Sequence, residues 1–396
     1  MTRLANTATR ISTTTTEAWV LRRGEKGTTS AGVLEKATYQ LPAMTERHVL
    51  AEPIYGTWEA NMTHCLQRSP IDVCRIRREE AVVLGNAGVV RILETGSAVT
   101  TCRSGDMCLL VPIGSEDEYG HMIKVFGYDA PNMMGLLAKR AVFHELNVTP
   151  IPYPTRYSYA RWAGFPVRYG TAWENWKLCY NVWRAQFDLG DFPPPHVSGW
   201  GGAVSLAMAQ LAQHFDCPAS LVASNDYRLN LLRKLGITPI DRRKFPDLHF
   251  DEQRFEADRA YRAQYLQSEK AFLEEIDNVT HGQGVSIFVD NIGGPVFRAG
   301  LRALGRLGII TTSGWKHGKH LSYDRTAATV NRHIFLHVHG CRRSEGLAAV
   351  QFAEEHGWLP PDGDQVYAWD EVPKLAADYA ANKTDSYAPV FQVNPL

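Results

Sequence analysis

The stretch SGWGGAVSLAMAQLA, residues 198–212, decides how the chain is interpreted. Its first part is rich in glycine, and its second part is small and apolar, as in a buried helix. A Gly-rich turn between a strand and a helix points backbone N–H groups and the positive end of the helix dipole at a phosphate. The turn is predicted to be formed by Gly199, Gly201, Gly202, Ala203 and Val204.

The strand expected before this turn is unusual. It reads DFPPPHVS, residues 191–198, and its prolines donate no ladder hydrogen bonds, so a central strand here is short or begins at His196. The glycine spacing also departs from the common G-x-G-x-x-G pattern. By itself the stretch therefore fits two interpretations, a dinucleotide-binding turn or a Gly-rich loop before a core helix.

The sequence that follows favours the dinucleotide-binding turn. Helical and apolar strand segments alternate along SLAMAQLAQHF, ASLVAS, RLNLLRKLG, GITPID, VSIFVDN, VFRAGLRALGRLG and IITTSG. Such alternation predicts βαβ units and a parallel sheet covered on both faces, which is the doubly wound α/β class.

The end of the second strand indicates which dinucleotide binds. Ser224 stands where an NAD-binding protein usually carries an acid for the ribose 2′-hydroxyl. Arg228 follows four residues later, and a hydroxyl with a guanidinium suits a 2′-phosphate, so NADPH is predicted over NADH. Asp226 is interpreted as the N-cap of the next helix. Two later strand ends, at Asn291 and Gly314, are expected beside the nicotinamide.

Around this α/β segment the chain has another character. Residues 1–165 hold short apolar segments between Gly and polar turns, which predicts a β-rich domain. Residues 166–345 form the predicted dinucleotide-binding domain, with a polar helical insert at 245–282. Residues 346–396 are expected to return to the first domain, which makes it discontinuous. The Thr-rich residues 1–15 are interpreted as a loose tail, with a transit peptide as the alternative.

Composition excludes several classes of function. Lys plus Arg equals Asp plus Glu, at 42 each, so neither nucleic acid nor an anionic membrane is an expected partner. No apolar run approaches the length of a membrane span. The seven cysteines are scattered without a CxxC pair, which favours reduced thiols in the cytoplasm. A small molecule is the expected partner.

The order of these features resembles the medium-chain dehydrogenase/reductase superfamily. The matching segments are GDMCLLVP at Gly105, the Gly-rich turn, VDNIGGPVF and GIITTSG. The resemblance implies a GroES-like β-rich catalytic domain joined to a Rossmann cofactor domain. Where the zinc-dependent branch has a Cys and a Gly-His-Glu, this chain has Glu59 and, in LGNAG, Asn86 and Ala87. The resemblance is therefore to the zinc-independent branch, and no metal is expected.

Within that branch the chain is most similar to crotonyl-CoA carboxylase/reductases and related 2-enoyl-thioester reductases. Asn61 in TWEANM matches the second Asn of an NYN segment, and FGYD places Tyr128 and Asp129 at a Phe-Glu pair. In LHVHGCRRSEG, His339 falls on the His of an IGSHFANYREA-type segment of that subfamily when Glu345 is matched to its Glu. These four residues are the catalytic candidates that the resemblance implies.

The implied reaction is hydride transfer from NADPH to the β-carbon of an α,β-unsaturated acyl thioester, carried by CoA or a carrier protein. Carboxylating members of the subfamily use the four matched positions around carbon dioxide. Since the Phe-Glu pair is changed to Tyr128 and Asp129, reduction is the inference kept here and carboxylation is left open. The resemblance also implies a homodimer or homotetramer.

Each candidate also has a purely structural interpretation. Asn61 fits a turn or a helix cap, Tyr128 and His339 fit a packed core, and Asp129 fits an Asx-turn. Glu59 is interpreted as a structural acid that pairs with an arginine. For the whole chain the alternatives are a quinone or enone reductase of the same fold and a nucleotide-binding subunit without catalysis.

Overall fold

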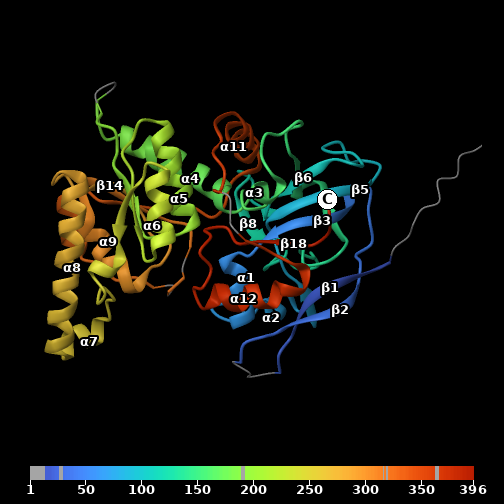
Figure 1. Ribbon diagram of the computed structural model, residues 1–396, viewed down its shortest axis with the longest axis horizontal. Helices are drawn as coiled ribbons and strands as arrows, with labels where there is room; N and C mark the ends of the chain where they lie inside the picture. The colour runs from blue at the N-terminus through green and yellow to red at the C-terminus, as the bar shows by residue number, and fades with distance from the viewer. Residues whose placement is uncertain (1–13, 26–29, 189–191, 315, 318–319, 362–364) are drawn as a thin grey trace, which may run out of the picture.

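The computed structural model describes residues 14–25, 30–188, 192–314, 316–317, 320–361 and 365–396. Two domains lie side by side, a β-rich domain on the right of Figure 1 and an α/β domain on the left. Most of the predicted N-terminal tail lies outside the described residues, and the first strand begins at Thr15.

The β-rich domain is built on an open sheet with the strand order β10-β6-β5-β3-β18-β17, in which β9 also pairs with β3. A second sheet has the order β2-β1-β4, and β7 pairs with β8. The strands are β1 (Thr15–Arg22), β2 (Leu34–Gln40), β3 (His48–Thr57), β4 (Ala81–Val83), β5 (Gly88–Thr95), β6 (Met107–Leu110), β7 (Ile113–Glu116), β8 (Met122–Val125), β9 (Ala141–His144), β10 (Val148–Pro150), β17 (Val366–Tyr367) and β18 (Val390–Gln392). The helices are α1 (Ala60–Gln67), α2 (Val73–Arg77), α3 (Tyr159–Ala163) and α12 (Val372–Ala380), with short 3₁₀ turns η1 (Glu145–Asn147) and η3 (Trp369–Glu371).

The α/β domain has the parallel sheet that the sequence predicts. Its strands are β11 (Val197–Gly199), β12 (Ser220–Ala223), β13 (Thr238–Asp241), β14 (Val285–Val289), β15 (Leu304–Thr312) and β16 (Ile334–His337). The ladder β11-β14-β15-β16 and the pair β12-β13 are joined by a parallel bridge between Val197 and Ala219. The resulting order, β13-β12-β11-β14-β15-β16, is the 3-2-1-4-5-6 order of dinucleotide-binding sheets. The prediction of an α/β Rossmann domain beside a β-rich domain is therefore confirmed.

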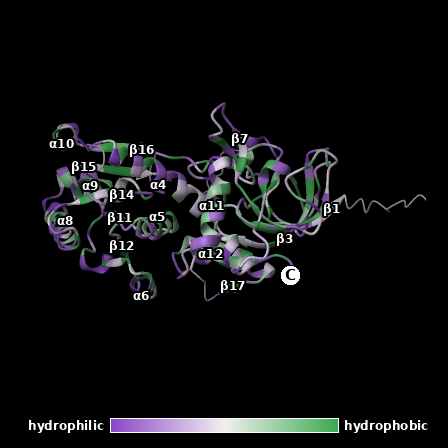
Figure 2. Ribbon diagram, turned by 90° about the horizontal axis from the view of Figure 1, so that it is seen from above, coloured by the Kyte–Doolittle hydropathy of each residue, from purple (hydrophilic) through white to green (hydrophobic). Residues whose placement is uncertain are grey.

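Helices cover both faces of this parallel sheet. They are α4 (Arg168–Arg184), α5 (Ala203–His214), α6 (Asp226–Lys234), α7 (Glu252–Ala257), α8 (Arg259–Thr280), α9 (Gly294–Ala303), α10 (Arg325–Asn331) and α11 (Arg343–His356), with a 3₁₀ turn η2 (Arg242–Lys244). In Figure 2 the central strands lie between α5 on one side and α8 on the other. All residues of β12 are buried, as are four of the five in β14, which explains why these segments read as continuous apolar runs.

Some boundaries differ from the sequence prediction for local physical reasons. The helix predicted to reach Gly308 ends at Ala303, because β15 begins at Leu304 and pairs with β14. The helical insert is broken at Asp258, whose side chain accepts the N–H groups of Ala260 and Tyr261 and caps α8. Strand β11 has only three residues, as its proline-rich approach predicted.

The two ends of the β-rich domain meet in one sheet. Strand β18 pairs antiparallel with β3, with Val390 opposite Thr57 and Gln392 opposite Tyr55. Helix α11, by contrast, contributes Ala349 and Ala353 to an apolar cluster formed largely by α4 and α5. The C-terminal segment therefore lies along the α/β domain first and enters the β-rich sheet only afterwards.

Candidate active site

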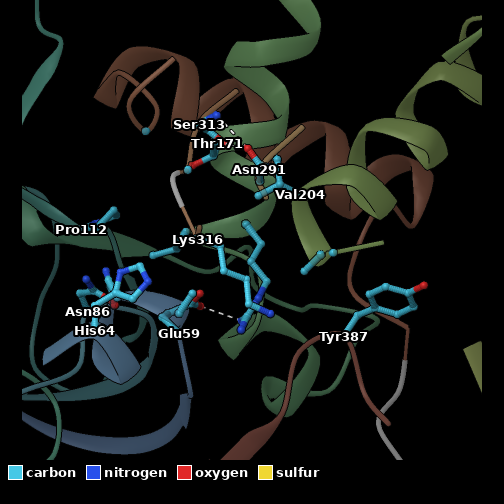
Figure 3. Close-up of a pocket in the computed structure, with 18 of the residues that line it drawn as sticks. Glu59, His64, Asn86, Pro112, Thr171, Val204, Asn291, Ser313, Lys316 and Tyr387 are labelled. Atoms are coloured by element: carbon cyan, nitrogen blue, oxygen red, sulfur yellow. Dashed lines mark hydrogen bonds and ion pairs between the residues drawn. The ribbon is translucent and has the colours of Figure 1, made fainter. Parts of the chain in front are cut away.

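A cavity of about 330 Å³ lies between the two domains. The β-rich domain contributes α1 and the turns after β4 and β8, and the α/β domain contributes the start of α5 and the ends of β14 and β15. Figure 3 shows Glu59, His64 and Asn86 together on one side of this cavity, with Asn291 and Ser313 on the other.

The structure brings most of the sequence-predicted residues to this cavity. Those that line it are Asn61, Tyr128, His339, Gly201, Gly202, Ala203, Val204, Arg228, Asn291 and Gly314. Asp129, Gly199 and Ser224 are not among the lining residues. Ten predicted positions from seven separate stretches of the sequence thus meet at a single site.

The Gly-rich turn is shaped by close backbone contacts. A Cβ atom on Gly199 would lie 2.7 Å from the Val289 carbonyl oxygen, and one on Gly201 would lie 2.5 Å from the Val222 carbonyl oxygen. On Gly202 it would meet no described atom within 4 Å. Gly202 is the N-cap residue of α5 and supplies no side-chain cap. The start of α5 therefore presents uncapped N–H groups beside open space, as an anion site requires.

Hydrogen bonds fix the turn after β14 and connect it to the end of β15. Asp290 accepts the N–H groups of Ile292 at 2.8 Å and Gly293 at 2.9 Å, which forms the turn after β14. Burial raises the pKa of Asp290 to about 6, against the lowering effect of those two N–H bonds. Asn291 Oδ1 then accepts the backbone N–H of Ser313 at 2.8 Å. This bond fixes Asn291 beside Gly314 at the cavity wall.

The residues after β12 are arranged differently from the prediction. The N-cap of α6 is Asn225, whose side chain accepts the Arg228 N–H at 2.8 Å. Asp226, predicted as the cap, is exposed and forms an ion pair with Arg243 at 2.8 Å. The prediction was wrong because the helix begins one residue earlier than expected, at Asp226, so the Asn225 amide and not the Asp226 carboxylate reaches the third N–H of the helix. Ser224 is exposed outside the cavity.

Arg228 lines the cavity and also fastens a segment of the β-rich domain. Its Nε donates to the Asp385 carbonyl oxygen and its Nη2 to the Thr384 carbonyl oxygen, both at 3.0 Å. Its guanidinium carbon lies 4.7 Å from the centre of the Tyr387 ring. The predicted phosphate-binding arginine therefore sits where the two domains touch.

Asn61 and Tyr128 reach the cavity with polar atoms that have no hydrogen-bond partner among the described residues. The atoms are Asn61 Oδ1 and the Tyr128 hydroxyl, and both are buried. Asn61 is the second residue of α1, whose N-cap is Glu59, so it does not cap the helix. Burial, with smaller effects from Cys65 and Asp129, raises the pKa of Tyr128 and keeps its phenol protonated.

The other two catalytic candidates have evident structural contacts. Asp129 Oδ1 accepts the backbone N–H of Val125, four residues earlier, at 2.7 Å, so its carboxylate binds the end of β8 and does not form the Asx-turn that was considered. His339 lies beyond the end of β16 at the cavity edge, with Nδ1 3.2 Å from the Met122 carbonyl oxygen. A carbonyl oxygen only accepts, so Nδ1 carries the proton in this contact.

A buried ion pair between Glu59 and Arg168 lies in the floor of the cavity. Arg168 Nη1 lies 2.6 Å from Glu59 Oε1, and the two side chains are only 4% and 6% exposed. Arg168 also donates to Thr57 Oγ1 and to the Trp58 carbonyl oxygen, both at 2.7 Å. The interpretation of Glu59 as a structural acid paired with an arginine agrees with this geometry. The partner, far away in sequence at the start of α4, was not predicted.

Two further lining residues had no assigned role. His64 follows Asn61 by three residues on α1, so the helical period places both on one face. Burial lowers the pKa of His64, and the charges of Lys316 and His317 lower it further. Asn86, noted in the sequence only as a replacement for a metal ligand, is fully buried in the cavity wall.

Solved structures of other proteins share the fold of this chain. The crotonyl-CoA carboxylase/reductase AntE, solved in complex with NADP, matches with a TM-score of 0.78 over 96% of this chain and 95% of its own, at 18% identity. The chain has the medium-chain dehydrogenase/reductase fold. No family model and no curated protein sequence matches it.

Other structures of the medium-chain dehydrogenase/reductase fold match over similar lengths. The 2-octenoyl-CoA carboxylase reductase CinF of a Streptomyces species, in complex with NADP and 2-octenoyl-CoA, has a TM-score of 0.78 over 96% of this chain and 88% of its own, at 17% identity. An NAD-dependent alcohol dehydrogenase has a TM-score of 0.73 over 96% and 100%, at 19% identity. At such identities the likeness establishes the fold alone.

Two further observations concern metal binding and membrane spans. Within the described ranges, no three His, Cys, Asp or Glu side chains gather closely enough to hold a metal ion. No helix in that part of the chain is both long and apolar enough to cross a membrane.

The Glu59–Arg168 pair predicts a pH dependence of stability. Burial raises the pKa of Glu59 from 4.5 to about 7, against the lowering effect of Arg168. The folded state then holds the Glu59 proton more tightly than the unfolded state, so stability falls as the pH rises from about 4.5 to 7, by up to about 3 kcal/mol. Glu59→Gln should lack this fall, which urea unfolding at several pH values would measure. Identical pH profiles for the two proteins would refute the raised pKa.

Proposed function

We propose that the protein is an NADPH-dependent oxidoreductase that reduces the carbon–carbon double bond of an α,β-unsaturated acyl thioester. One observation carries the proposal. A single cavity joins the uncapped start of α5 to the unpaired polar atoms of Asn61 and Tyr128. Two proteins of similar fold support it, since AntE was solved with NADP and CinF with NADP and 2-octenoyl-CoA.

The residues present fit such a cofactor. The open space at Gly202 and the N–H groups that follow it would hold the diphosphate. Arg228 would face the 2′-phosphate, and Asn291 and Gly314 the nicotinamide end. When bound, NADPH supplies the hydride for the reduction.

The side chains of the β-rich domain then act on the acyl group. Negative charge develops on the thioester oxygen as the β-carbon is reduced, and fixed donors in a cavity that excludes water stabilise it. The buried, protonated Tyr128 hydroxyl is such a donor. His339, whose Nδ1 contacts the Met122 carbonyl oxygen, lines the same cavity and would help to orient a water toward the α-carbon.

Arg228→Ala tests the choice of cofactor. We expect the KM for NADPH to rise about tenfold or more, because a charge-assisted contact to the 2′-phosphate is lost, with little change for NADH. Steady-state kinetics with both cofactors would measure this. Since Arg228 also holds residues 384 and 385, an equal loss for both cofactors would show that only the domain contact had been broken. Arg228→Lys is the control that keeps the charge.

Mass spectrometry of the product tests the reaction itself. The protein would be incubated with NADPH, crotonyl-CoA and bicarbonate. A gain of two hydrogens would establish reduction, and an added carboxyl group would show that the site with Tyr128 and Asp129 also fixes carbon dioxide. Turnover of enones or quinones but of no thioester would replace the proposed substrate class. Absence of turnover with every acceptor would leave a nucleotide-binding subunit and overturn the proposal.

Assembly and location belong to the same proposal. The edge strand β16 carries the part-exposed apolar residues Ile334, Phe335 and Leu336, and a second copy could continue the sheet there to give a homodimer or homotetramer. A monomeric mass in solution would refute this. All seven cysteines are free, which supports the cytoplasm as the compartment.

A further inference from the structure

Two short turns of similar sequence meet in the wall of the cavity. One is Leu84-Gly85-Asn86 and the other is Phe126-Gly127-Tyr128, so each has an apolar residue, a glycine and a polar residue. Both glycines have positive φ, +102° at Gly85 and +60° at Gly127. A Cβ atom on Gly127 would lie 2.6 Å from the Gly85 carbonyl oxygen, so the two backbones are in direct contact. This contact brings Asn86 and Tyr128 close together, and both line the cavity.

The side chain of Asn86 has the features expected of a ligand-binding residue. Its side chain is 0% exposed, and neither its Nδ2 nor its Oδ1 finds a hydrogen-bond partner in the described part of the chain. Asn394 is also buried, but its Nδ2 donates to the carbonyl oxygens of Pro53 at 2.8 Å and Lys139 at 2.9 Å. Asn394 therefore stabilises the fold, whereas Asn86 has no such bond.

An unpaired buried carboxamide lowers stability, because both its polar atoms have lost water without gaining a partner. The neighbouring Tyr128 hydroxyl is in the same condition. Two donors that line one cavity and have no acceptor among the described residues match an acceptor atom that a ligand supplies. A carbonyl oxygen, which has two lone pairs, can accept from both.

We infer that Asn86 Nδ2 and the Tyr128 hydroxyl both donate hydrogen bonds to the carbonyl oxygen of the substrate. This inference rests on the proposed function and adds Asn86 to it as a catalytic residue. A C–H bond of NADPH would break and a new C–H bond would form at the β-carbon, which oxidises NADPH to NADP⁺. The π electrons of the C=C bond would then shift to join the α-carbon to the carbonyl carbon. The carbonyl π pair moves onto the oxygen, where the two donors stabilise it as an enolate. A proton from solvent then binds the α-carbon, and the carbonyl bond forms again.

The two donors on one oxygen predict opposite effects on stability and catalysis. Asn86→Leu removes the unpaired carboxamide at nearly constant volume, so the melting temperature should stay equal or rise. The kcat for crotonyl-CoA reduction should fall about 100-fold, while the Kd for NADPH changes less than about threefold. Tyr128→Phe should give a similar loss, and the double variant should lose less than the product of the two, because one oxygen is shared.

Two other variants serve as controls. Asn394→Leu removes two made hydrogen bonds, so the melting temperature should fall while the kcat of the folded protein is kept. Asn86→Ala repeats the Asn86 test with a smaller side chain, should leucine not fit. The inference is overturned if the Asn86 variants keep their kcat, or if they lose stability as Asn394→Leu does without a specific loss of turnover.

The same variants separate this inference from the proposed function. If the wild-type protein reduces enones but no thioester, the thioester proposal fails. A 100-fold loss in enone turnover on Asn86→Leu would still support donation to a carbonyl oxygen. Unchanged enone turnover would overturn the inference. A protein that reduces no acceptor at all would overturn both.

Discussion

Arg168→Met is expected to lower the free energy of unfolding by about 3–5 kcal/mol at neutral pH, because it leaves the buried carboxylate of Glu59 without its counter-charge. The substitution also removes the hydrogen bonds to Thr57 and Trp58. Urea unfolding of the wild type and the variant would measure the difference. The loss should be smaller at pH 5, since a Glu59 pKa of about 7 means that the group is then neutral.

The double variant Arg168→Met, Glu59→Leu is the matched control. It removes both charges and fills the space with apolar atoms, and such replacements of buried ion pairs are often neutral or stabilising. Its stability should therefore recover most of the loss. A double variant as unstable as Arg168→Met alone would show that the pair itself is not the cause, and that the bonds of Arg168 to the backbone matter more.

Gly202→Ala is expected to weaken NADPH binding about 100-fold, or about 3 kcal/mol, without changing the melting temperature of the free protein. The backbone at Gly202 is extended, with φ of 171°, and an added Cβ meets no described atom within 4 Å. The free protein therefore has room for the methyl group. A diphosphate bound at the start of α5 would collide with it. Fluorescence titration with NADPH and a thermal melt would measure the two quantities.

Gly201→Ala provides the contrast. Its Cβ would lie 2.5 Å from a backbone oxygen of β12, which cannot rotate away. This variant should lose stability with or without cofactor. If Gly202→Ala binds NADPH as well as the wild type, the diphosphate does not lie against this turn and the cofactor assignment is wrong there.

The general fold could be predicted because it rests on local signals that repeat. Alternating apolar strands and helices gave the parallel sheet, and the prolines before Val197 gave the short β11. The helix α4 was not predicted, because its many aromatic residues resemble a core segment of either kind until they pack against α5 and α11. The end of α9 depends on strand pairing at Leu304, which no local pattern reveals.

The site could be predicted only in part. Residues beside a recognisable turn, such as Gly202 and Asn291, reached the cavity as expected. Asp129 did not, because a carboxylate four residues after Val125 bonds more readily to that nearby N–H than across a cavity. The sequence gives no role to Asn86 or Arg168. Asn86 is recognised by its lack of hydrogen-bond partners among the described residues, and Arg168 by its ion pair with Glu59, which forms only on folding.

The pairing of β18 with β3 has a consequence for the order of biosynthesis. Thr57 and Trp58 bond to Pro389, a residue 332 positions after Thr57, so this part of the cavity floor lacks its partner until Pro389 has been synthesised. The α/β strands, from Val197 to His337, all precede Pro389 in the chain. A nascent chain therefore exposes a finished dinucleotide fold while the edge of β3 beside Glu59 is still open. The half of the cavity that the β-rich domain forms is therefore completed after the strands of the α/β domain have been synthesised.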